Sequence, residues 1–188
     1  MGEYYLDIET YSPHEKPDPL KDKIVAIAYQ RLSTRDGSPE GKLEILTEWG
    51  FGSERSMLAA FKSVLLTGND FDFVPIGVNL YGFDLLALIH RLNRHFRLQL
   101  GMEFFRSRPV VDIKSVLVMI NRGSFSRYEH LLGKESDGAQ IREWYESKRY
   151  SKITKYVKQE AANFVRVYRI LKRRMPQISV PKTLHSLT

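Results

Sequence analysis

Two acidic residues, Asp7 and Glu9, lie on either side of Ile8 in the segment EYYLDIETYS near the beginning of the chain. If this segment is a strand, alternate side chains share a face, so both carboxylates project together from backbone positions roughly 6.6 to 6.8 Å apart. Like charges this close repel each other unless a cation or protons compensate. A solvent-facing strand edge also commonly carries charges. The pair is therefore either part of a metal site or an ordinary strand edge, and further ligands must decide.

A second polar group stands where the segment FDFVPIGVN passes into FDLLALIHRLNRHF. The hydrophobic pattern predicts that the first segment is a strand ending at Asn79 and that the second is a helix with Asp84 in its first turn. An acidic residue suits a helix N-terminus for electrostatic reasons alone. Ligands of open α/β sheets also gather where strands end and helices begin. Asn79 and Asp84 are thus candidates for one wall of a site.

A third group lies on the last predicted helix, where Tyr156 and Glu160 are four residues apart and therefore share one side. Beside them runs an apolar stripe, which we expect to face the core, made of Ile153, Val157, Ala161, Phe164, Tyr168 and Leu171. The opposite face is basic, with Lys155, Lys158, Arg166, Arg169 and Arg173. A tyrosine and a glutamate that border an apolar stripe need no functional explanation on their own.

The elements that must position these residues follow from the hydrophobic pattern. It predicts strands at 3–9, 23–32, 43–49 and 71–79, and a further short strand running into a helix within 109–121. It predicts helices at 53–66, 83–96 and about 151–174, a short helix near 123–133, and an irregular tail at 175–188. Three strands joined by short connections and followed by alternating helices and strands indicate a mixed sheet with helices on its faces.

Composition limits the possible functions of the chain. Its 188 residues carry a formal charge of +7 and contain no cysteine, which excludes disulfides, thiolate zinc sites and cysteine nucleophiles. No apolar run approaches the roughly 20 residues that span a bilayer, and no signal peptide is evident, so we expect a soluble, cytoplasmic protein without a membrane partner. A basic surface attracts polyanions, which favours nucleic acid, although basic surfaces without that role are common.

In order and context, the three groups resemble the exonuclease motifs of the DEDD nucleases, which belong to the ribonuclease H-like superfamily. The first motif resembles DIET, the second resembles NLYGFD in an N-x-x-x-F-D pattern, and the third resembles YVKQE in the Y-x-x-x-D pattern of the tyrosine branch. The region from VVDIKSVL to YRIL is similar to the proofreading domains of family B DNA polymerases, and closer to stand-alone exonucleases related to them. The likeness covers most of residues 3–174.

The resemblance implies an α/β fold with a ribonuclease H-like mixed central sheet and helices on both faces. It implies a single 3′-to-5′ exonuclease domain over residues 1–188, with its core at about 3–174. It also implies two divalent cations, Mg²⁺ or Mn²⁺, held by Asp7, Glu9, Asp84 and Glu160. In this arrangement Asp7 bridges both ions, Glu9 and Glu160 hold the ion beside the attacking water, and Asp84 supports the second ion through water.

By the same resemblance, Tyr156 orients the attacking water, and Thr10, Asn79 and Tyr81 are candidates for gripping the terminal nucleotide. One position departs from the family, because Glu160 stands where Asp is usual and its side chain is longer by one C–C bond of about 1.5 Å. A cluster of carboxylates without His or Cys favours Mg²⁺ or Mn²⁺ over zinc. His90 and His95 are accordingly expected to be surface residues rather than ligands.

Three functions stay open at this point. The first is a metal-dependent 3′-to-5′ exonuclease that hydrolyses single-stranded DNA to nucleoside 5′-monophosphates, with replication or repair proteins as possible partners. The second keeps the chemistry but acts on RNA; the polymerase-like resemblance favours DNA. The third is a nucleic-acid-binding accessory module with weakened catalysis, which the departure at Glu160 motivates.

Overall fold

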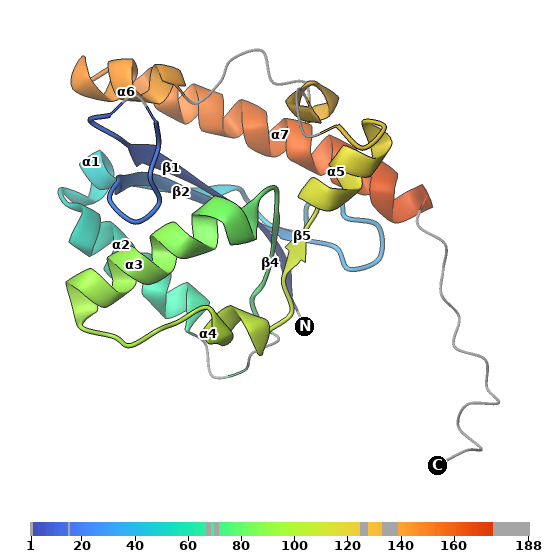
Figure 1. Cartoon of the computed structure of the whole chain (residues 1–188), viewed down its shortest axis with the longest axis horizontal. Helices are drawn as coiled ribbons and strands as arrows, with labels where there is room; N and C mark the ends of the chain where they lie inside the picture. The colour runs from blue at the N-terminus through green and yellow to red at the C-terminus, as the bar shows by residue number, and fades with distance from the viewer. Residues whose placement is uncertain are drawn as a thin grey trace.

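The computed structural model describes residues 2–14, 16–66, 69, 72–124, 128–132 and 139–174. Its strands form one five-stranded sheet in the order β3-β2-β1-β4-β5 (Figure 1). The strands are β1 (Glu3–Tyr11), β2 (Lys23–Leu32), β3 (Glu44–Thr47), β4 (Val74–Gly77) and β5 (Val111–Asp112). Pairing is antiparallel from β3 through β2 to β1, and parallel from β1 through β4 to β5. The mixed sheet predicted from the sequence is therefore confirmed.

Helices cover both faces of this sheet, as predicted (Figure 1). The α-helices are α1 (Glu48–Phe51), α2 (Glu54–Leu65), α3 (Leu85–Phe96), α4 (Glu103–Arg106), α5 (Lys114–Ile120), α6 (Ala139–Glu146) and α7 (Tyr150–Arg174). A π-helix, η1 (Leu80–Asp84), precedes α3, and a 3₁₀-helix, η2 (Tyr128–Leu132), precedes α6. One hydrophobic cluster joins the sheet to α5, α6 and α7, and a second joins it to α2 and α3.

The central strand β1 divides its side chains between these two clusters. Tyr5 packs in the cluster that includes α7, whereas Leu6 and Ile8 pack in the cluster that includes α2 and α3. Asp7 and Glu9 share the face of Tyr5, since side chains alternate along a strand. Alanines stand opposite both acids on β2, with Asp7 paired to Ala28 and Glu9 to Ala26. These small neighbours leave space above the sheet beside the two carboxylates.

The β1 and β2 ladder changes register immediately after Glu9. Glu9 pairs with Ala26 but Thr10 pairs with Ile24, so Val25 is an extra residue on β2. Such a bulge bends the strand and increases its twist, and bulges are frequent beside functional sites. The irregularity therefore lies at the acidic pair.

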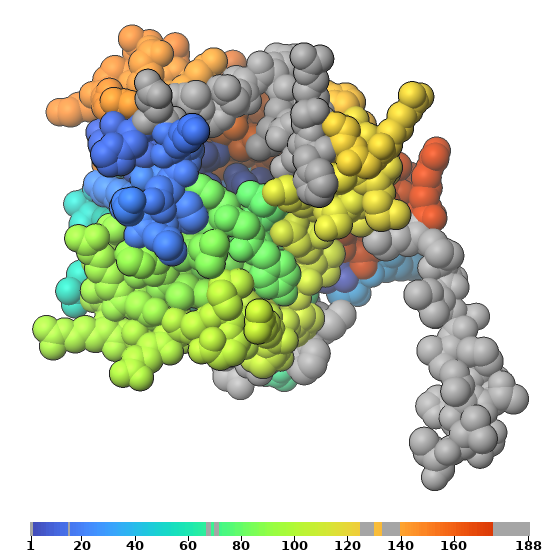
Figure 2. All heavy atoms as spheres, in the orientation of Figure 1, coloured from blue at the N-terminus to red at the C-terminus, as the bar shows by residue number. Residues whose placement is uncertain are grey.

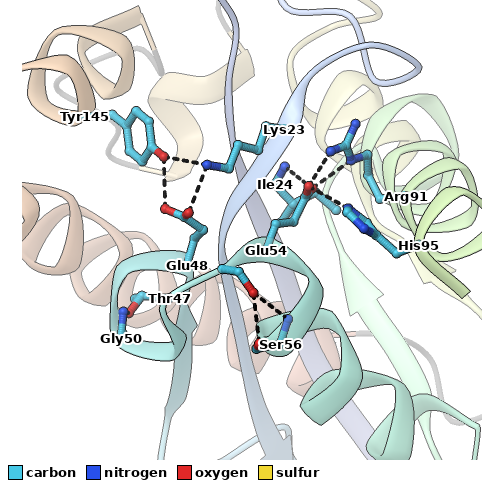
Figure 3. A network of polar contacts seen from close by, with 11 residues as sticks. Lys23, Ile24, Thr47, Glu48, Gly50, Glu54, Ser56, Arg91, His95 and Tyr145 are labelled. Carbon is cyan, nitrogen blue, oxygen red and sulfur yellow. Dashed lines mark hydrogen bonds and ion pairs between the residues drawn. The ribbon is translucent and has the colours of Figure 1, made fainter.

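A buried charged group fastens α2 and α3 to β2 (Figure 3). Glu54, the first residue of α2, is 5% exposed and accepts hydrogen bonds from the Ile24 N–H at 2.8 Å and from Arg91 Nε at 2.7 Å. His95 Nε2 lies 2.9 Å from the same carboxylate. The expected surface position of His95 holds only in part, because its side chain is 23% exposed and its ring contacts Glu54 between the two helices.

Several element boundaries differ from the prediction. The third predicted strand ends early, because the Thr47 side chain accepts a hydrogen bond from the Gly50 N–H and starts α1, so Trp49 is helical. The sequence pattern missed the short helices α4 and α6. Within the predicted short helix near 123–133, residues 128–132 form η2, and the predicted tail at 175–188 lies outside the described residues. No helix in the described part of the chain is both long and apolar enough to cross a membrane.

Candidate metal centre

Three carboxylates from two distant parts of the chain converge above the sheet. Asp7 and Glu9 come from β1, and Glu160 comes from the middle of α7, where it is 8% exposed. One oxygen of each side chain lies within 4.8 Å of the others. Two oxygens on opposite sides of a bound Mg²⁺ are about 4.2 Å apart, because each Mg–O bond is about 2.1 Å. The three side chains therefore fit a divalent cation, and Glu160 reaches the cluster despite its extra C–C bond.

Asp84 lines the same pocket as these three acids and comes from the segment that follows β4. It is 5% exposed, and its Oδ1 accepts a hydrogen bond from the Ile8 N–H at 3.0 Å. The parallel pairing of β1 with β4 extends only to Tyr5 and Ile76, so Ile8 lies beyond the paired part of β4. Asp84 accepts a hydrogen bond from a backbone donor that has no partner on β4, and this bond holds Asp84 beside Ile8, the residue between Asp7 and Glu9.

The sequence pattern predicts Asp84 in the first turn of an α-helix, and the structure differs. Asp84 is the last residue of the π-helix η1, and α3 begins at Leu85. A π-helix is rare, and short π segments are frequent at functional sites. Asn79 lies just before η1 with φ 62°, in the left-handed region, two residues after β4 ends. The π-helix η1 is thus the segment that places Asp84 beside β1.

The four acids and Tyr156 line one pocket of about 220 Å³. The remaining lining residues are Tyr5, Ile8, Val78, Asn79, Phe83, Leu132, Asn163 and Phe164. Figure 2 shows the pocket as a hollow near the middle of the face, with dark blue atoms of β1 at its floor, green atoms of the η1 and α3 segment beside it and orange atoms of α7 behind. The pocket opens at the C-terminal ends of β1 and β4, where ligands of such sheets bind.

Two tyrosines beside the acids remain protonated. Burial, and then the negative charge of Glu9, raise the pKa of Tyr156 far above its ordinary value, and a hydrogen bond with Glu160 acts in the same direction. Burial and the charge of Asp7 likewise raise the pKa of Tyr5. A neutral phenol can donate a hydrogen bond. Tyr156 is therefore a neutral hydroxyl beside the carboxylates.

The structure brings together most, but not all, of the site residues predicted from the sequence. Asp7, Glu9, Asp84, Tyr156 and Glu160 line the pocket together, and Asn79 lies at its wall. Thr10 and Tyr81 are not among the lining residues, and the Tyr81 side chain is exposed.

Among the polar lining residues, sequence reasoning missed Tyr5 and Asn163. Tyr5 shares the strand face of Asp7, and Asn163 lies three residues after Glu160 on α7. Strand alternation and helical spacing from the acids are the signals that could have identified them.

An aromatic and basic corner adjoins the pocket where α6 meets α7. Trp144 of α6 lies edge to face with Tyr156, with ring centres 6.0 Å apart. Lys152 Nζ lies 6.0 Å from the centre of the Trp144 ring. Lys155 is exposed one turn further along α7. Aromatic rings interspersed with cations suit the bases and phosphates of a single strand.

Comparison with solved structures finds structures of exonuclease I among the similar chains. One is a complex with the inhibitor BCBP, with a TM-score of 0.60 and 13% identity. Another is the ExoI/SSB-Ct complex, with a TM-score of 0.59 and 15% identity. Both alignments cover 94% of this chain and 42% of the exonuclease I chain. A structure of E. coli exonuclease I with a 5cy-dA13 oligonucleotide, at 15% identity, covers 63% of this chain and 29% of that chain with a TM-score of 0.49.

No protein-family model matches the sequence, and no curated protein matches it either. The chain spans less than half of the length of the exonuclease I chains, at 42% in the longer alignments. At identities of 13% and 15%, the likeness concerns the fold. The chain has an α/β, ribonuclease H-like fold, with a mixed five-stranded sheet between helices, and it shares this fold with exonuclease I.

Proposed function

We propose that this protein is a metal-dependent 3′-to-5′ exonuclease of the tyrosine branch of the DEDD nucleases, acting on single-stranded DNA. One observation carries the proposal: oxygens of Asp7, Glu9 and Glu160 lie within 4.8 Å of one another at the floor of a pocket. Carboxylates held together at this separation repel each other, and a divalent cation removes the repulsion. An acidic metal site could serve several functions, and the fold that the chain shares with exonuclease I supports a nuclease.

The donor set determines the kind of cation. Asp7, Glu9, Glu160 and Asp84 offer only hard carboxylate oxygens, which favour Mg²⁺ or Mn²⁺. These four residues would hold two such cations. When bound, the cations supply an activated water and stabilise the leaving 3′-oxygen of the scissile phosphodiester.

The protein's own residues would position the substrate and the water. Tyr156 would donate its hydroxyl hydrogen bond within the pocket, because burial and Glu9 keep its pKa far above neutral. Asp84, fixed by the Ile8 N–H, would hold its carboxylate at a constant distance from β1. Phe83 and Phe164 form apolar parts of the pocket wall, which exclude water from the reacting groups. These groups together would select the last phosphodiester at a 3′ end.

The surroundings of the pocket support an unpaired strand as substrate. Trp144 offers a ring for base stacking, and Lys152 and Lys155 offer cations for phosphates. The net charge of +7 favours binding of a polyanion. The proposed domain has its core at about residues 3–174, and its partners would be replication or repair proteins in the cytoplasm. Exonuclease I occurs in complex with SSB-Ct, which makes a single-strand-binding protein one partner to test.

The experiment compares matched oligonucleotides of DNA and RNA, labelled at the 5′ end, with Mn²⁺ or Mg²⁺ and with EDTA. We expect a ladder that shortens from the 3′ end, faster on DNA, and no cleavage in EDTA. Faster cleavage of RNA would show that the substrate preference is wrong while the chemistry stands, because tolerance of the 2′-hydroxyl is a local property of the pocket. Inert protein on both substrates would contradict the proposal.

A binding module with weakened catalysis is the second candidate, because Glu160 replaces the usual Asp. A Glu160→Asp variant separates the two. The position of the Glu160 oxygen among the other acids favours activity with the native residue. We expect both forms to cleave; cleavage by Glu160→Asp alone would favour the weakened module.

A further inference from the structure

Asp112 binds the turn that carries Asn79. Its Oδ1 accepts hydrogen bonds from the Asn79 N–H at 2.8 Å and from the Lys114 N–H at 3.0 Å. Its Oδ2 accepts one from the Tyr81 N–H at 3.2 Å. Asp112 is the last residue of β5, whereas Asn79 and Tyr81 flank the start of η1. One carboxylate therefore joins two segments more than thirty residues apart and fixes the backbone on both sides of Leu80.

The turn is closely packed around the Asn79 side chain. A Cβ atom added at Gly82 would overlap Asn79 Oδ1. A Cβ atom added at Gly77 would lie 2.6 Å from the Leu6 carbonyl oxygen. Asn79 itself has φ 62°, which asparagine tolerates better than most residues. Both glycines thus let the turn close against β1 and against the carboxamide of Asn79.

Lys114 then sets the direction of that carboxamide. Its Nζ donates a hydrogen bond to Asn79 Oδ1 at 2.7 Å. An amide whose oxygen accepts from an ammonium group presents its NH₂ group as the donor for other partners. Because Asn79 lines the pocket together with Asp7 and Asp84, that donor belongs to the wall of the candidate metal centre. No motif in the sequence pointed to Lys114 or Asp112.

We propose that Lys114 is a positioning residue for substrate binding. It orients the Asn79 carboxamide so that Nδ2 donates a hydrogen bond to a sugar or phosphate oxygen of the terminal nucleotide, and Asp112 holds the turn on which this depends. The inference rests on the proposed exonuclease function. Every nucleotide carries such oxygens, so the contact supports binding of any 3′ end irrespective of its base. Lys114 acts through Asn79 and does not touch the reacting atoms.

The kinetic test uses four variants: Lys114→Met, Asn79→Leu, the double variant that combines these two changes, and the conservative variant Lys114→Arg. Loss of one hydrogen bond is expected to raise KM about three- to tenfold and to leave kcat within about twofold. The double variant should be no worse than Asn79→Leu, and Lys114→Arg should restore most of the binding. The matched control is Lys42→Met, which removes an exposed lysine outside the pocket and should not change KM.

Two results would overturn the proposal. Additive effects in the double variant would show that Lys114 acts independently of Asn79. A salt dependence of KM that weakens by about one unit of slope in Lys114→Met, but not in Asn79→Leu, would show a direct contact of Lys114 with a phosphate.

A readout without catalysis separates this inference from the proposed function. The side-chain amide signals of Asn79 in an ¹⁵N-correlated NMR spectrum can be assigned by their absence in Asn79→Leu. We expect Lys114→Met, but not Lys42→Met, to shift them. Unchanged signals would contradict the orienting role of Lys114. Shifted signals in a protein that neither binds nor cleaves oligonucleotides would support the orienting contact and show that the exonuclease proposal, with its nucleotide-binding role for Asn79, is wrong.

Discussion

Neutralising Glu160 should stabilise the protein while removing its response to metal. In Glu160→Gln the amide oxygen can still accept the hydrogen bond of the Tyr156 hydroxyl, so the change removes mainly the charge. Glu160 is 8% exposed, and water therefore screens its charge only weakly. Without a bound cation, the native carboxylate is repelled by both acids of β1.

The size of this repulsion follows from the separation of the oxygens. Two unit charges 4.8 Å apart interact by about 3.5 kcal/mol at an effective dielectric constant of about 20, and both Asp7 and Glu9 lie within that distance of Glu160. Solvent and counter-ions reduce the net effect on stability. We expect Glu160→Gln to raise the free energy of unfolding by about 1 to 3 kcal/mol in EDTA.

The assay is urea denaturation of both proteins in EDTA and in excess Mn²⁺. A cation present at about one hundred times its dissociation constant stabilises the wild type by about 2.7 kcal/mol, whereas Glu160→Gln should lose most of this gain. Glu44→Gln is the control, because Glu44 is an exposed glutamate on β3 outside the pocket. Its stability should change by less than about 0.5 kcal/mol under both conditions.

The reasoning would be refuted by a Glu160→Gln variant that is less stable than the wild type in EDTA and gains as much from Mn²⁺. That result would mean that the carboxylates do not repel one another in the absence of metal. It would also mean that Glu160 does not contribute to a cation site.

Other consequences of the structure can be tested in the same way. Glu54→Ala leaves Arg91 buried without its carboxylate and should lower the free energy of unfolding by about 3 to 5 kcal/mol in urea denaturation; a loss below about 1 kcal/mol would contradict this. Burial raises the pKa of Glu54, but hydrogen bonds from Arg91 and His95 lower it by more, so the folded-state pKa lies below the ordinary 4.5. The stabilisation from Glu54 is therefore complete above pH 4.5 and is lost as the pH falls through the folded-state pKa. Acid titration of the stability of wild type and Glu54→Ala would show this loss in the wild type alone. Tyr156→Phe should reduce kcat by about tenfold or more in Mn²⁺, because the variant lacks the hydroxyl that lines the pocket beside the acids; an unchanged kcat would contradict this role.

The sequence predicted the fold well where one periodic pattern determined each element. The alternation of β1 predicted that Asp7 and Glu9 share one face, the apolar stripe of α7 predicted the face that packs in the core, and both are confirmed. The predicted boundaries and surface positions were inaccurate where a side-chain contact, rather than the hydrophobic pattern, determined the local structure. Thr47 caps a helix inside a predicted strand, and Glu54 binds His95, whose side chain is 23% exposed rather than fully on the surface. The contact between Glu54 and His95 joins residues that are distant in the sequence, so a local pattern cannot contain it. The Thr47 cap is local, but its partner Gly50 lies three residues away, just after the segment whose strand-like pattern hides the cap.

The sequence predicted the acidic residues of the candidate site, but it did not predict the hydrogen bonds that hold the site in place. The spacing of Asp7 and Glu9 follows from strand geometry, and the structure brings Asp84 and Glu160 to them. The bond from the Ile8 N–H to Asp84 arises because β4 ends before β1 does, and this difference in length is a tertiary property. Similarly, only the parallel pairing of β4 with β5 brings Asp112 beside Asn79. The sequence alone offered no signal for either contact.

The most direct test of the central claim is the rate at which wild type and Asp7→Asn shorten a 5′-labelled single-stranded oligonucleotide in Mn²⁺. Asp7→Asn keeps the size of the side chain and removes one of the three clustered charges. We predict progressive shortening from the 3′ end by the wild type and a loss of at least about a hundredfold in the variant. Equal rates for the two proteins, or an inert wild type that still binds the strand, would contradict the assignment of this acidic cluster as an exonuclease centre.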